Sequence, residues 1–401
     1  MTLLFEAFFH VVLLAGGGTG GHVFPAVAVA QEIRRVSPET EVVFVGTERG
    51  LEARVVPRLG YPLDTLHVRH LKGGGLGGWA RGLAALPRAG AEALEILRRR
   101  RPAAVISVGG YAAGPVTAAA AALGIPTALM EQNAIPGMTN RLLGRVVDEC
   151  YVSFDQTCEL LPEQAACRVL GNPVRRELLD AVAQKPSEGG LPVAERDRRQ
   201  EFRIFITGGS GGAGPLNADL PILFRRLEAE LAERLVIRHQ AGRGRSMPVV
   251  DGYRGFGGQV EVVEFIDDMA EAYRWADLAI CRAGATTLAE LLVLGQPALL
   301  VPFAGAADDH QARNAEAATR AGAAVMVREP ELRDGRAARL LTGLVRNPAA
   351  LDNMRHQALK LARPDAGRAI AEAIVQLARL RQGPASHRAA PNLTATEGAD
   401  P

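Results

Sequence analysis

Residues 11–22 read Val-Val-Leu-Leu-Ala-Gly-Gly-Gly-Thr-Gly-Gly-His, an apolar run that passes directly into a glycine-rich turn. A second apolar run, over residues 203–207, passes into Gly208-Gly209-Ser210-Gly211-Gly212. A turn without side chains lets backbone N–H groups approach an anion closely, and the helix that follows adds the positive end of its dipole. The two turns therefore predict two strand-to-helix phosphate sites, one in each half of the chain.

Short β-branched runs alternate with helix-length amphipathic segments, which is typical of parallel sheets with crossover helices. The predicted fold class is α/β, with ligands bound at the carboxyl ends of the strands. The first strand is expected over residues 10–14. Further strands are expected over residues 42–45, 104–108, 127–130, 203–207, 235–239, 278–281 and 298–301.

A polar stretch that contains Pro and Gly divides the 401 residues into two nearly equal halves. It includes Pro186 and Pro192 and precedes a charged run, a composition typical of a linker. Residues 383–401 lack periodicity and are predicted to form a disordered tail. We therefore predict a first domain over 1–174, a linker over 175–200 and a second domain over 201–382, whose last helix can pack back on the first domain.

The composition is that of an ordinary globular protein, with 48% hydrophobic residues, 22% charged residues and a net charge of +2. Such a charge gives no argument for nucleic acid, so no nucleic-acid partner is expected. Cys150, Cys158, Cys167 and Cys281 form no CxxC pair, which predicts reduced thiols in a cytosolic protein.

No segment offers the roughly 20 mostly apolar residues that a membrane-spanning helix needs. Residues 1–14 are apolar, but they lack Lys and Arg and contain Glu6, which disfavours a signal peptide. We expect a soluble or peripheral protein.

The first glycine turn also satisfies the G-x-G-x-x-G pattern of dinucleotide-binding proteins. The usual companion is an acid at the end of the second strand that binds the ribose, but the strand over 42–45 ends in Gly46-Thr47. A dinucleotide site is therefore disfavoured. Thr19 and His22 place a hydroxyl and an imidazole beside the turn, which favours a ligand site over a purely structural turn.

A third strand-to-helix turn, over residues 281–290, reads Cys-Arg-Ala-Gly-Ala-Thr-Thr-Leu-Ala-Glu. The N–H groups around Ala285 and Thr286 can hold a diphosphate. Glu290 lies one helical turn beyond Thr286 on the same face, where a carboxylate can accept two ribose hydroxyls. The alternative is an ordinary capped helix with a solvated glutamate.

Residues 308–311 read Asp-Asp-His-Gln and follow another expected strand. The amide of Gln311 can donate to and accept from sugar hydroxyls. His310 with two aspartates is also compatible with a metal site, but further ligands would have to come from elsewhere. We therefore predict no metal.

Seven motifs follow one another along the chain: residues 16–25, 109–115, 131–133 (Glu-Gln-Asn), 171–175 (Gly-Asn-Pro-Val-Arg), 208–210, 264–269 and 281–290. With these motifs the chain resembles the MurG family of peptidoglycan N-acetylglucosaminyltransferases. The resemblance implies a GT-B architecture, in which two Rossmann-like doubly wound domains face a central cleft. The chain departs from the family pattern at Gly211, where the family usually has Gln, and at Met130, where some relatives carry His.

The resemblance also implies roles for individual residues. Ile266 would bind the uracil through its backbone, Glu290 the ribose and Ser210 the diphosphate. Gln311 and Asn133 would bind N-acetylglucosamine hydroxyls. The other residues implied at the substrate site are Thr19, Gly20, Gly21, Arg175, Arg282, Ala285, Thr286, Thr287, Leu288 and Ala289.

The implied reaction moves N-acetylglucosamine from UDP-N-acetylglucosamine to the 4-hydroxyl of the muramoyl sugar of undecaprenyl-diphosphate-linked lipid I, giving lipid II with inversion. A general base must take the hydroxyl proton, and the charge that develops on UDP must be stabilised. His22 is the candidate base because the usual histidine pKa lies near neutrality, and Glu131 is its rival. Helix N-termini and Arg282 can stabilise UDP without a metal, so no metal or other cofactor is expected.

The lipid acceptor requires contact with a membrane, and residues 69–101 offer one. Eight Lys or Arg residues stand there against two Glu, and three apolar residues recur at helical spacing. Such a face can bind anionic headgroups, although the apolar residues could equally belong to the core. The predicted membrane residues are Lys72, Trp79, Arg81, Leu83, Leu86 and Arg88. The implied location is the cytoplasmic face of the bacterial inner membrane, as a peripheral protein.

Two other functions remain open from the sequence. One is a related GT-B enzyme that moves a different sugar onto another lipid, such as diacylglycerol. The other is a nucleotide-binding protein without catalysis. The motifs over 109–115 and 131–133 favour the lipid I transferase, whose family implies further partners among cell-wall synthesis and division proteins.

Overall fold

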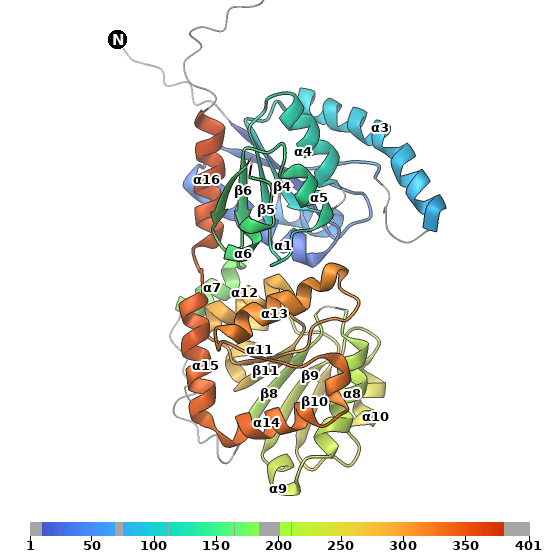
Figure 1. Cartoon of the computed structure of the whole chain (residues 1–401), viewed down its shortest axis with the longest axis vertical. Coiled ribbons are helices and arrows are strands. Elements are labelled where there is room, and N and C mark those ends of the chain that lie inside the picture. The colour runs from blue at the N-terminus through green and yellow to red at the C-terminus, as the bar shows by residue number, and fades with distance from the viewer. Residues whose placement is uncertain are drawn as a thin grey trace, which may run out of the picture.

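The computed structural model describes residues 10–68, 75–110, 112–163, 165–183, 201–209 and 211–380, with the backbone alone at 75–86, 181, 183 and 380. Two parallel sheets lie one beyond the other along the long axis of the molecule, each flanked by helices (Figure 1). The predicted α/β fold class is confirmed. Ser210, Lys72 and the expected tail lie outside the described residues, as do the side chains of Trp79, Arg81, Leu83 and Leu86.

The first sheet has seven parallel strands in the order β3-β2-β1-β4-β5-β6-β7. Its central strands β1, β2, β4 and β5 are covered on both faces and read as nearly continuous apolar runs. Val12 and Leu14 of β1 face helices α1 and α16, whereas Leu13 and Ala15 face α3 and α4. The strands are β1 (Val11–Gly16), β2 (Glu41–Gly46), β3 (Leu63–Thr65), β4 (Ala104–Gly109), β5 (Thr127–Glu131), β6 (Glu149–Val152) and β7 (Ala166–Val169).

The second sheet has six parallel strands in the order β10-β9-β8-β11-β12-β13. Ile204 and Ile206 of β8 face α8 and α14, and Phe205 faces α11, α12 and α13. The strands are β8 (Phe202–Thr207), β9 (Leu235–Gln240), β10 (Gln259–Val263), β11 (Leu278–Cys281), β12 (Ala298–Leu300) and β13 (Val325–Met326).

The helices around the first sheet are α1 (Gly20–Val36), α2 (Glu52–Val55), η1 (Pro57–Leu59), α3 (Gly75–Arg100), α4 (Ala113–Ala122), α5 (Met138–Leu143) and α6 (Asp155–Glu159). Those that follow are α7 (Arg176–Ala183), α8 (Gly214–Arg225), α9 (Ala229–Ala232), α10 (Ser246–Gly252), α11 (Met269–Trp275), α12 (Ala285–Leu294), η2 (Ala307–Asp309), α13 (His310–Arg320), η3 (Glu329–Leu332), α14 (Arg336–Arg346), α15 (Pro348–Leu361) and α16 (Ala366–Leu380).

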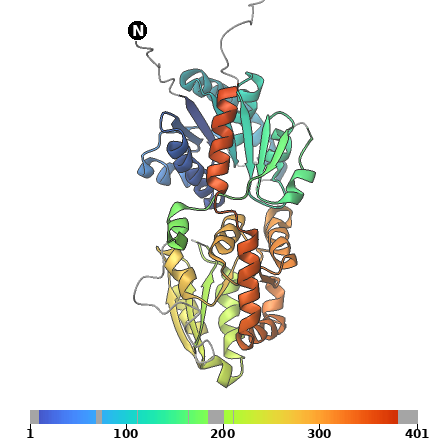
Figure 2. The same ribbon diagram turned by 90° about the vertical axis from the view of Figure 1, so that its left-hand side faces the viewer.

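The last helix returns to the first sheet. Ile370 and Ile374 of α16 are buried in one apolar cluster with Val12 and Leu14 of β1. Figure 2 shows α16 running along this half of the molecule while α15 runs along the other. The chain therefore crosses twice between the two sheets.

Three features differ from the sequence-based expectations. The first strand begins at Val11 and extends to Gly16. Five strands were not predicted, namely β3, β6, β7, β10 and β13, each of which is short or half-exposed. Residues 176–183 of the expected linker form helix α7, and residues 184–200 lie outside the description.

The cysteines also differ from expectation. A disulfide joins Cys158 of α6 to Cys167 of β7, so the prediction of reduced thiols is wrong for this pair. The turn between α6 and β7 brings the two Cα atoms to 5.8 Å, within the range that a disulfide spans. Cys150 and Cys281 are free and buried. None of the helices described is long and apolar enough to span a membrane.

Candidate active site

The first glycine turn joins β1 to α1 and packs against the turn that follows β4. Gly16 and Gly17 have φ values of 140° and 146°. A Cβ on Gly16 would lie 2.0 Å from the carbonyl oxygen of Gly109, to which the Gly17 N–H donates at 3.0 Å. Only glycine fits such an approach. Gly18 and Thr19 remain exposed at the start of α1.

The second glycine turn repeats this arrangement between β8 and α8. Gly212 has a φ of 68°, and a Cβ there would lie 1.9 Å from the carbonyl oxygen of Ala241, which follows β9. A Cβ on Gly211 would meet open space, so packing does not demand glycine at this departure from the family pattern. In both halves, a glycine turn packs tightly against the end of a neighbouring strand: the turn after β1 against β4, and the turn after β8 against β9.

His22 lies in the first turn of α1 with its imidazole against Gly109. A Cβ on Gly109 would lie 2.7 Å from Cδ2 and 2.9 Å from Nε2 of the ring. Burial lowers the pKa of His22, and Glu131, a hydrogen bond to the Gly17 backbone and Glu52 partly offset that effect. The imidazole is therefore neutral at neutral pH. Its Nδ1 lies 3.4 Å from the Thr19 hydroxyl oxygen.

Glu131, at the end of β5, uses its carboxylate to hold the loop that follows. One oxygen accepts from the backbone N–H and the side-chain amide of Asn133, at 3.0 and 3.2 Å. The other accepts from the Gly137 N–H and the Asn140 amide, both at 2.9 Å. The side chain is only 3% exposed. With four donors bound, this carboxylate is placed to order the loop.

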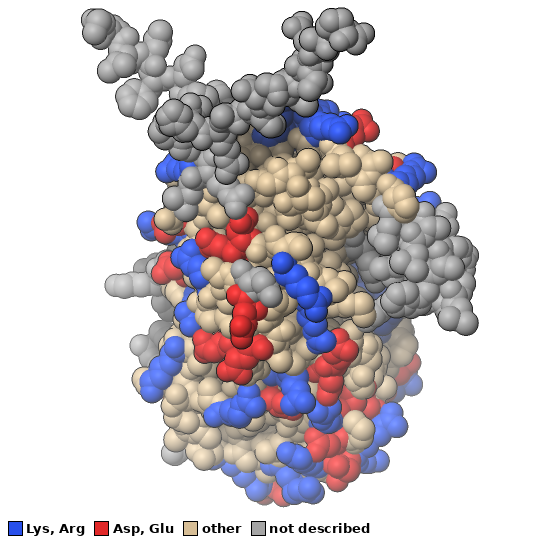
Figure 3. Space-filling view, turned by 45° about the horizontal axis from the view of Figure 1, so that its top comes forward, with Lys and Arg blue, Asp and Glu red and all other residues tan. Residues whose placement is uncertain are grey.

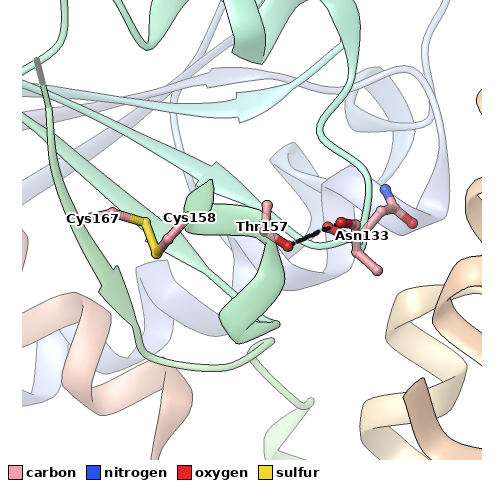
Figure 4. The surroundings of a disulfide bond; sticks show 5 residues. Asn133, Thr157, Cys158 and Cys167 are labelled. Atoms are coloured by element: carbon pink, nitrogen blue, oxygen red, sulfur yellow. Dashed lines mark hydrogen bonds between the residues drawn. A yellow bond between two sulfur atoms is a disulfide. The ribbon is translucent and has the colours of Figure 1, made fainter. Parts of the chain in front are cut away.

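The loop after β5 is bound from both halves of the molecule. Asn314 of α13 accepts from the Ala134 N–H at 2.8 Å and donates to Asn133 Oδ1 and to the Ala283 carbonyl, both at 3.1 Å. From the other side, the Thr157 hydroxyl donates to the carbonyls of Asn133 and Ala134 at 3.2 Å. Figure 4 shows Thr157 pointing at this loop directly beside the disulfide. The carboxyl ends of β5 and β11 are thereby joined.

In the second half, α12 presents its N-terminus after β11. Glu290 is 5% exposed and pairs with Arg175, whose two guanidinium nitrogens lie 3.0 and 3.2 Å from one carboxylate oxygen. Burial raises the pKa of Glu290, and Arg175 opposes that shift. The Thr286 hydroxyl is buried and has no hydrogen-bond partner among the described residues, which leaves it available to a ligand. The alternative prediction, a solvated glutamate at position 290, is therefore wrong.

The other residues of the predicted donor site surround this helix. Arg282 forms an ion pair of 2.6 Å with Glu329 and donates to the carbonyls of Val301 and Pro302, so its charge is already matched. Gln311 Oε1 accepts from the Phe303 N–H at 3.0 Å. Ala285 and Leu288 are buried, Thr287 and Ala289 are half-buried, and Ile266 packs against the core around Tyr273.

The residues considered for a metal site are engaged elsewhere. His310 Nδ1 lies 2.7 Å from the Ala307 carbonyl oxygen, and Asp309 pairs with Arg328. Within the part of the chain that the structure describes, no group of three or more His, Cys, Asp or Glu residues is placed to hold a metal ion.

A cavity of about 1010 Å³ lies between α1, α7, α15 and α16. The described residues that line it include none of those predicted for catalysis or substrate binding. The candidate active site lies instead in the turns that follow β1, β5 and β11. Three residues that sequence reasoning missed belong to it: Glu52, Thr157 and Asn314. Each is defined by a long-range hydrogen bond, for which the sequence carries no local signal.

Comparison with known proteins decides the family. The chain matches the glycosyltransferase family 28 N-terminal domain over residues 12–152 and the C-terminal domain over residues 203–370. A Myxococcus xanthus protein named UDP-N-acetylglucosamine--N-acetylmuramyl-(pentapeptide) pyrophosphoryl-undecaprenol N-acetylglucosamine transferase is 45% identical, over 93% of this chain and 94% of its own. The crystal structure of Acinetobacter baumannii MurG is 31% identical with a TM-score of 0.73, and the match covers 92% of this chain and 99% of that one. The chain belongs to the MurG family.

A further relative agrees with this assignment, and a more distant structure shares the fold. A Geobacter metallireducens protein of the same name is 42% identical, over 90% of this chain and 97% of its own. The glycosyltransferase of kitacinnamycin shares only 16% identity at a TM-score of 0.68, which shows the common fold alone. The MurG family resemblance and the GT-B fold predicted from the seven motifs are thus confirmed.

Proposed function

We propose that this chain transfers N-acetylglucosamine from UDP-N-acetylglucosamine to the 4-hydroxyl of the muramoyl sugar of undecaprenyl-linked lipid I, with inversion, to make lipid II for peptidoglycan synthesis. The observation that carries the proposal is the junction at Asn314. There the acceptor-half motif around Asn133 meets the donor-half motif after β11, within hydrogen-bond distance. We retain the domain division at 1–174, 175–200 and 201–382 as part of the proposal.

The donor site of the proposal lies around the N-terminus of α12. Its free N–H groups at Ala285 and Thr286, together with the unpartnered Thr286 hydroxyl, suit a diphosphate. Glu290, oriented by Arg175, suits the ribose hydroxyls. The Ile266 backbone would take the uracil, and Gln311 and Asn133 the sugar. Ser210 keeps its proposed role at the diphosphate.

In the proposed chemistry, His22 takes the proton from the acceptor hydroxyl as the bond to the sugar forms. Its lowered pKa keeps the imidazole neutral and ready to accept that proton. Thr19, Gly20 and Gly21 would line the acceptor side. Leaving UDP would be stabilised by the α12 N-terminus, since Arg282 is already paired with Glu329. We assign Glu131 to loop positioning.

Contact with an anionic membrane is proposed for the first half. Met138 and Leu142 of α5 and Val146 beyond it are 57%, 58% and 52% exposed, and Arg141 and Arg145 are exposed beside them. Helix α3, whose range includes all the predicted membrane residues except Lys72, contacts α4, and α4 contacts α5. Apolar side chains flanked by arginines suit the headgroup layer. We propose a peripheral location on the cytoplasmic face of the inner membrane.

Figure 3 shows basic and acidic side chains interspersed over the side that it views, with a broad area near its top where the described residues carry neither. Partners among cell-wall synthesis and division proteins remain a proposal that rests on the family alone.

The test is transfer of radiolabel from UDP-N-acetylglucosamine to a short-chain lipid I analogue, with UDP-glucose and UDP-galactose as parallel donors and with and without chelator. Selective, chelator-resistant transfer from UDP-N-acetylglucosamine is the expected result. Transfer from another donor would favour a related GT-B enzyme. UDP binding by calorimetry without transfer from any donor would favour a binding protein and contradict the proposal.

A further inference from the structure

A buried carboxylate lies directly under the first glycine turn. Glu52, at the start of α2, is 1% exposed. One carboxylate oxygen accepts from the Gly18 N–H at 2.7 Å, and the other accepts from the N–H and the hydroxyl of Thr47 at 2.9 and 2.8 Å. The side chain thus ties the turn after β1 to the turn after β2.

Three glycines enclose this carboxyl group. A Cβ on Gly17, Gly46 or Gly50 would lie 2.4, 2.5 or 2.2 Å from the nearest atom of the Glu52 side chain. No side chain fits at any of these positions while Glu52 stays in place. Burying a carboxylate costs several kcal/mol unless hydrogen bonds compensate, so this enclosure is built to hold a charge.

The same turn positions the proposed base. Gly17 donates to the Gly109 carbonyl, and the His22 imidazole packs against Gly109. Thr19 directly follows the residue that Glu52 holds and precedes α1, whose first turn carries His22. A shift of the turn would therefore move the imidazole relative to the acceptor.

Glu52 also occupies one N–H group of the first glycine turn from inside the protein, at Gly18 of the G-x-G-x-x-G pattern. Because the Gly18 N–H already binds this internal carboxylate, an acceptor anion would meet Thr19, Gly20 and Gly21 instead.

We propose that Glu52 is a positioning residue for the transfer reaction: its carboxylate fixes the first glycine turn and thereby places His22, without touching substrate. This inference rests on the proposed function, in which His22 is the base. The charged and titratable groups that face His22 are Glu131, Glu52 and His310. The negative charge of Glu52 supports the imidazolium, so its removal acts on the rate and on the pH dependence together.

The test compares Glu52→Gln with Glu48→Gln, a control in the same loop whose side chain is 59% exposed. Glutamine keeps the size of Glu52 but turns one acceptor into a donor that faces N–H groups. We expect kcat to fall roughly ten- to a hundredfold, KM for UDP-N-acetylglucosamine to stay within about twofold, and the acidic limb of the pH–rate profile to move to lower pH. Glu48→Gln should match the wild type in all three.

Thr47→Val separates the loss of hydrogen bonds in this loop from the loss of the charge, because it removes one hydrogen bond to Glu52 and one from the Gly50 N–H but leaves the carboxylate. It should lower kcat less than Glu52→Gln and leave the acidic limb in place. The inference is overturned if Glu52→Gln matches Glu48→Gln, or if its kcat falls while the acidic limb stays put. Wild type and His22→Ala are assayed in parallel: an inactive wild type would refute the proposed function, whereas a fully active His22→Ala would refute the role of His22 as the base, on which this inference depends.

Discussion

Asn314 and Asn133 hydrogen-bond to each other at 3.1 Å, one from α13 of the second half and the other from the loop after β5 of the first. Asn314 is fully buried and also binds the Ala134 N–H and the Ala283 carbonyl. A buried amide whose hydrogen-bond partners are all in place fixes the distance and the orientation of the groups that it binds. The two halves of the proposed site are therefore set relative to each other by one side chain.

Asn314→Ala should lower both stability and activity. The change leaves the Ala134 N–H and the Ala283 carbonyl without a partner, which should cost at least about 2 kcal/mol in the free energy of unfolding. Misplacement of the Asn133 loop should lower kcat more than about tenfold. Urea unfolding and the transfer assay check this, with the exposed Asn353→Ala on α15 as control. A wild-type rate in Asn314→Ala would contradict the importance of the junction.

His22→Ala should abolish most of the transfer. Loss of a general base should lower kcat by roughly 10²- to 10⁴-fold, while UDP affinity measured by calorimetry stays unchanged. Because burial lowers the pKa of His22, the acidic fall of wild-type kcat/KM, as the imidazole becomes protonated, should have its midpoint below the ordinary histidine pKa of 6.5. The exposed His356→Ala is the matched control. Near-normal turnover in His22→Ala would shift the base to another group.

Arg175→Ala should be more damaging to stability than Glu290→Gln. Removing the arginine leaves a buried carboxylate uncompensated, at a cost of about 3 kcal/mol or more, whereas Glu290→Gln removes the charge itself. The double variant should recover part of that loss. Urea unfolding measures the effect, and Arg176→Ala, from an exposed ion pair with Asp180, serves as control.

The same variants should rank differently in their affinity for UDP than in their stability. Glu290→Gln and the double variant should both bind UDP at least about tenfold more weakly by calorimetry, because both lack the carboxylate proposed for the ribose. Recovery of UDP affinity together with stability in the double variant would argue against a ribose role for Glu290.

His239 should make the protein less stable in acid. The side chain is fully buried between Tyr253 and Asn217, and burial lowers its pKa from 6.5 to about 3. Between these two pH values the unfolded chain binds a proton that the folded chain does not. The contribution of neutral His239 to the free energy of unfolding is therefore complete above pH 6.5. It is lost at up to about 1.4 kcal/mol per pH unit as the pH falls toward 3.

The variant that tests this is His239→Gln, compared with His356→Gln at an exposed position. Urea unfolding at several values between pH 7.5 and 4.5 should show a shallower decline for His239→Gln than for the control. Parallel declines in the two variants would mean that His239 does not carry the acid sensitivity.

Charge reversal on the proposed membrane face should weaken vesicle binding. We expect Lys72→Glu, Arg81→Glu and Arg88→Glu, combined, to reduce co-sedimentation with vesicles that contain phosphatidylglycerol, since each basic residue near the surface contributes about 1 kcal/mol. Binding to neutral vesicles should be weak for all forms. The control reverses three exposed arginines of the second half: Arg226, Arg254 and Arg346. An equal loss in both triple variants would point to net charge in place of this face.

Several parts of the fold could be predicted from local sequence. The fully buried strands β1, β4, β8 and β11 appear as continuous apolar runs that end in glycine or a polar turn, because a sheet covered on both faces needs apolar residues throughout. Strands β3 and β13 have three and two residues, which is too short for a periodic pattern. Helix α7 escaped detection because it has only eight residues and directly precedes the stretch that contains Pro186 and Pro192, although its sequence is amphipathic.

The sequence alone determined the two sheets, the two glycine turns and the family, since each depends on residues adjacent along the chain. Tertiary structure alone decided the pairings that build the site: Glu52 with Gly18 at a separation of 34 residues, Arg175 with Glu290 at 115, and Asn133 with Asn314 at 181. It also decided that Cys158 meets Cys167 and that Arg282 is bound to Glu329. A hydrogen bond or ion pair requires two groups within a few ångströms, and only the packing of the sheets and helices brings residues so distant in sequence to that separation.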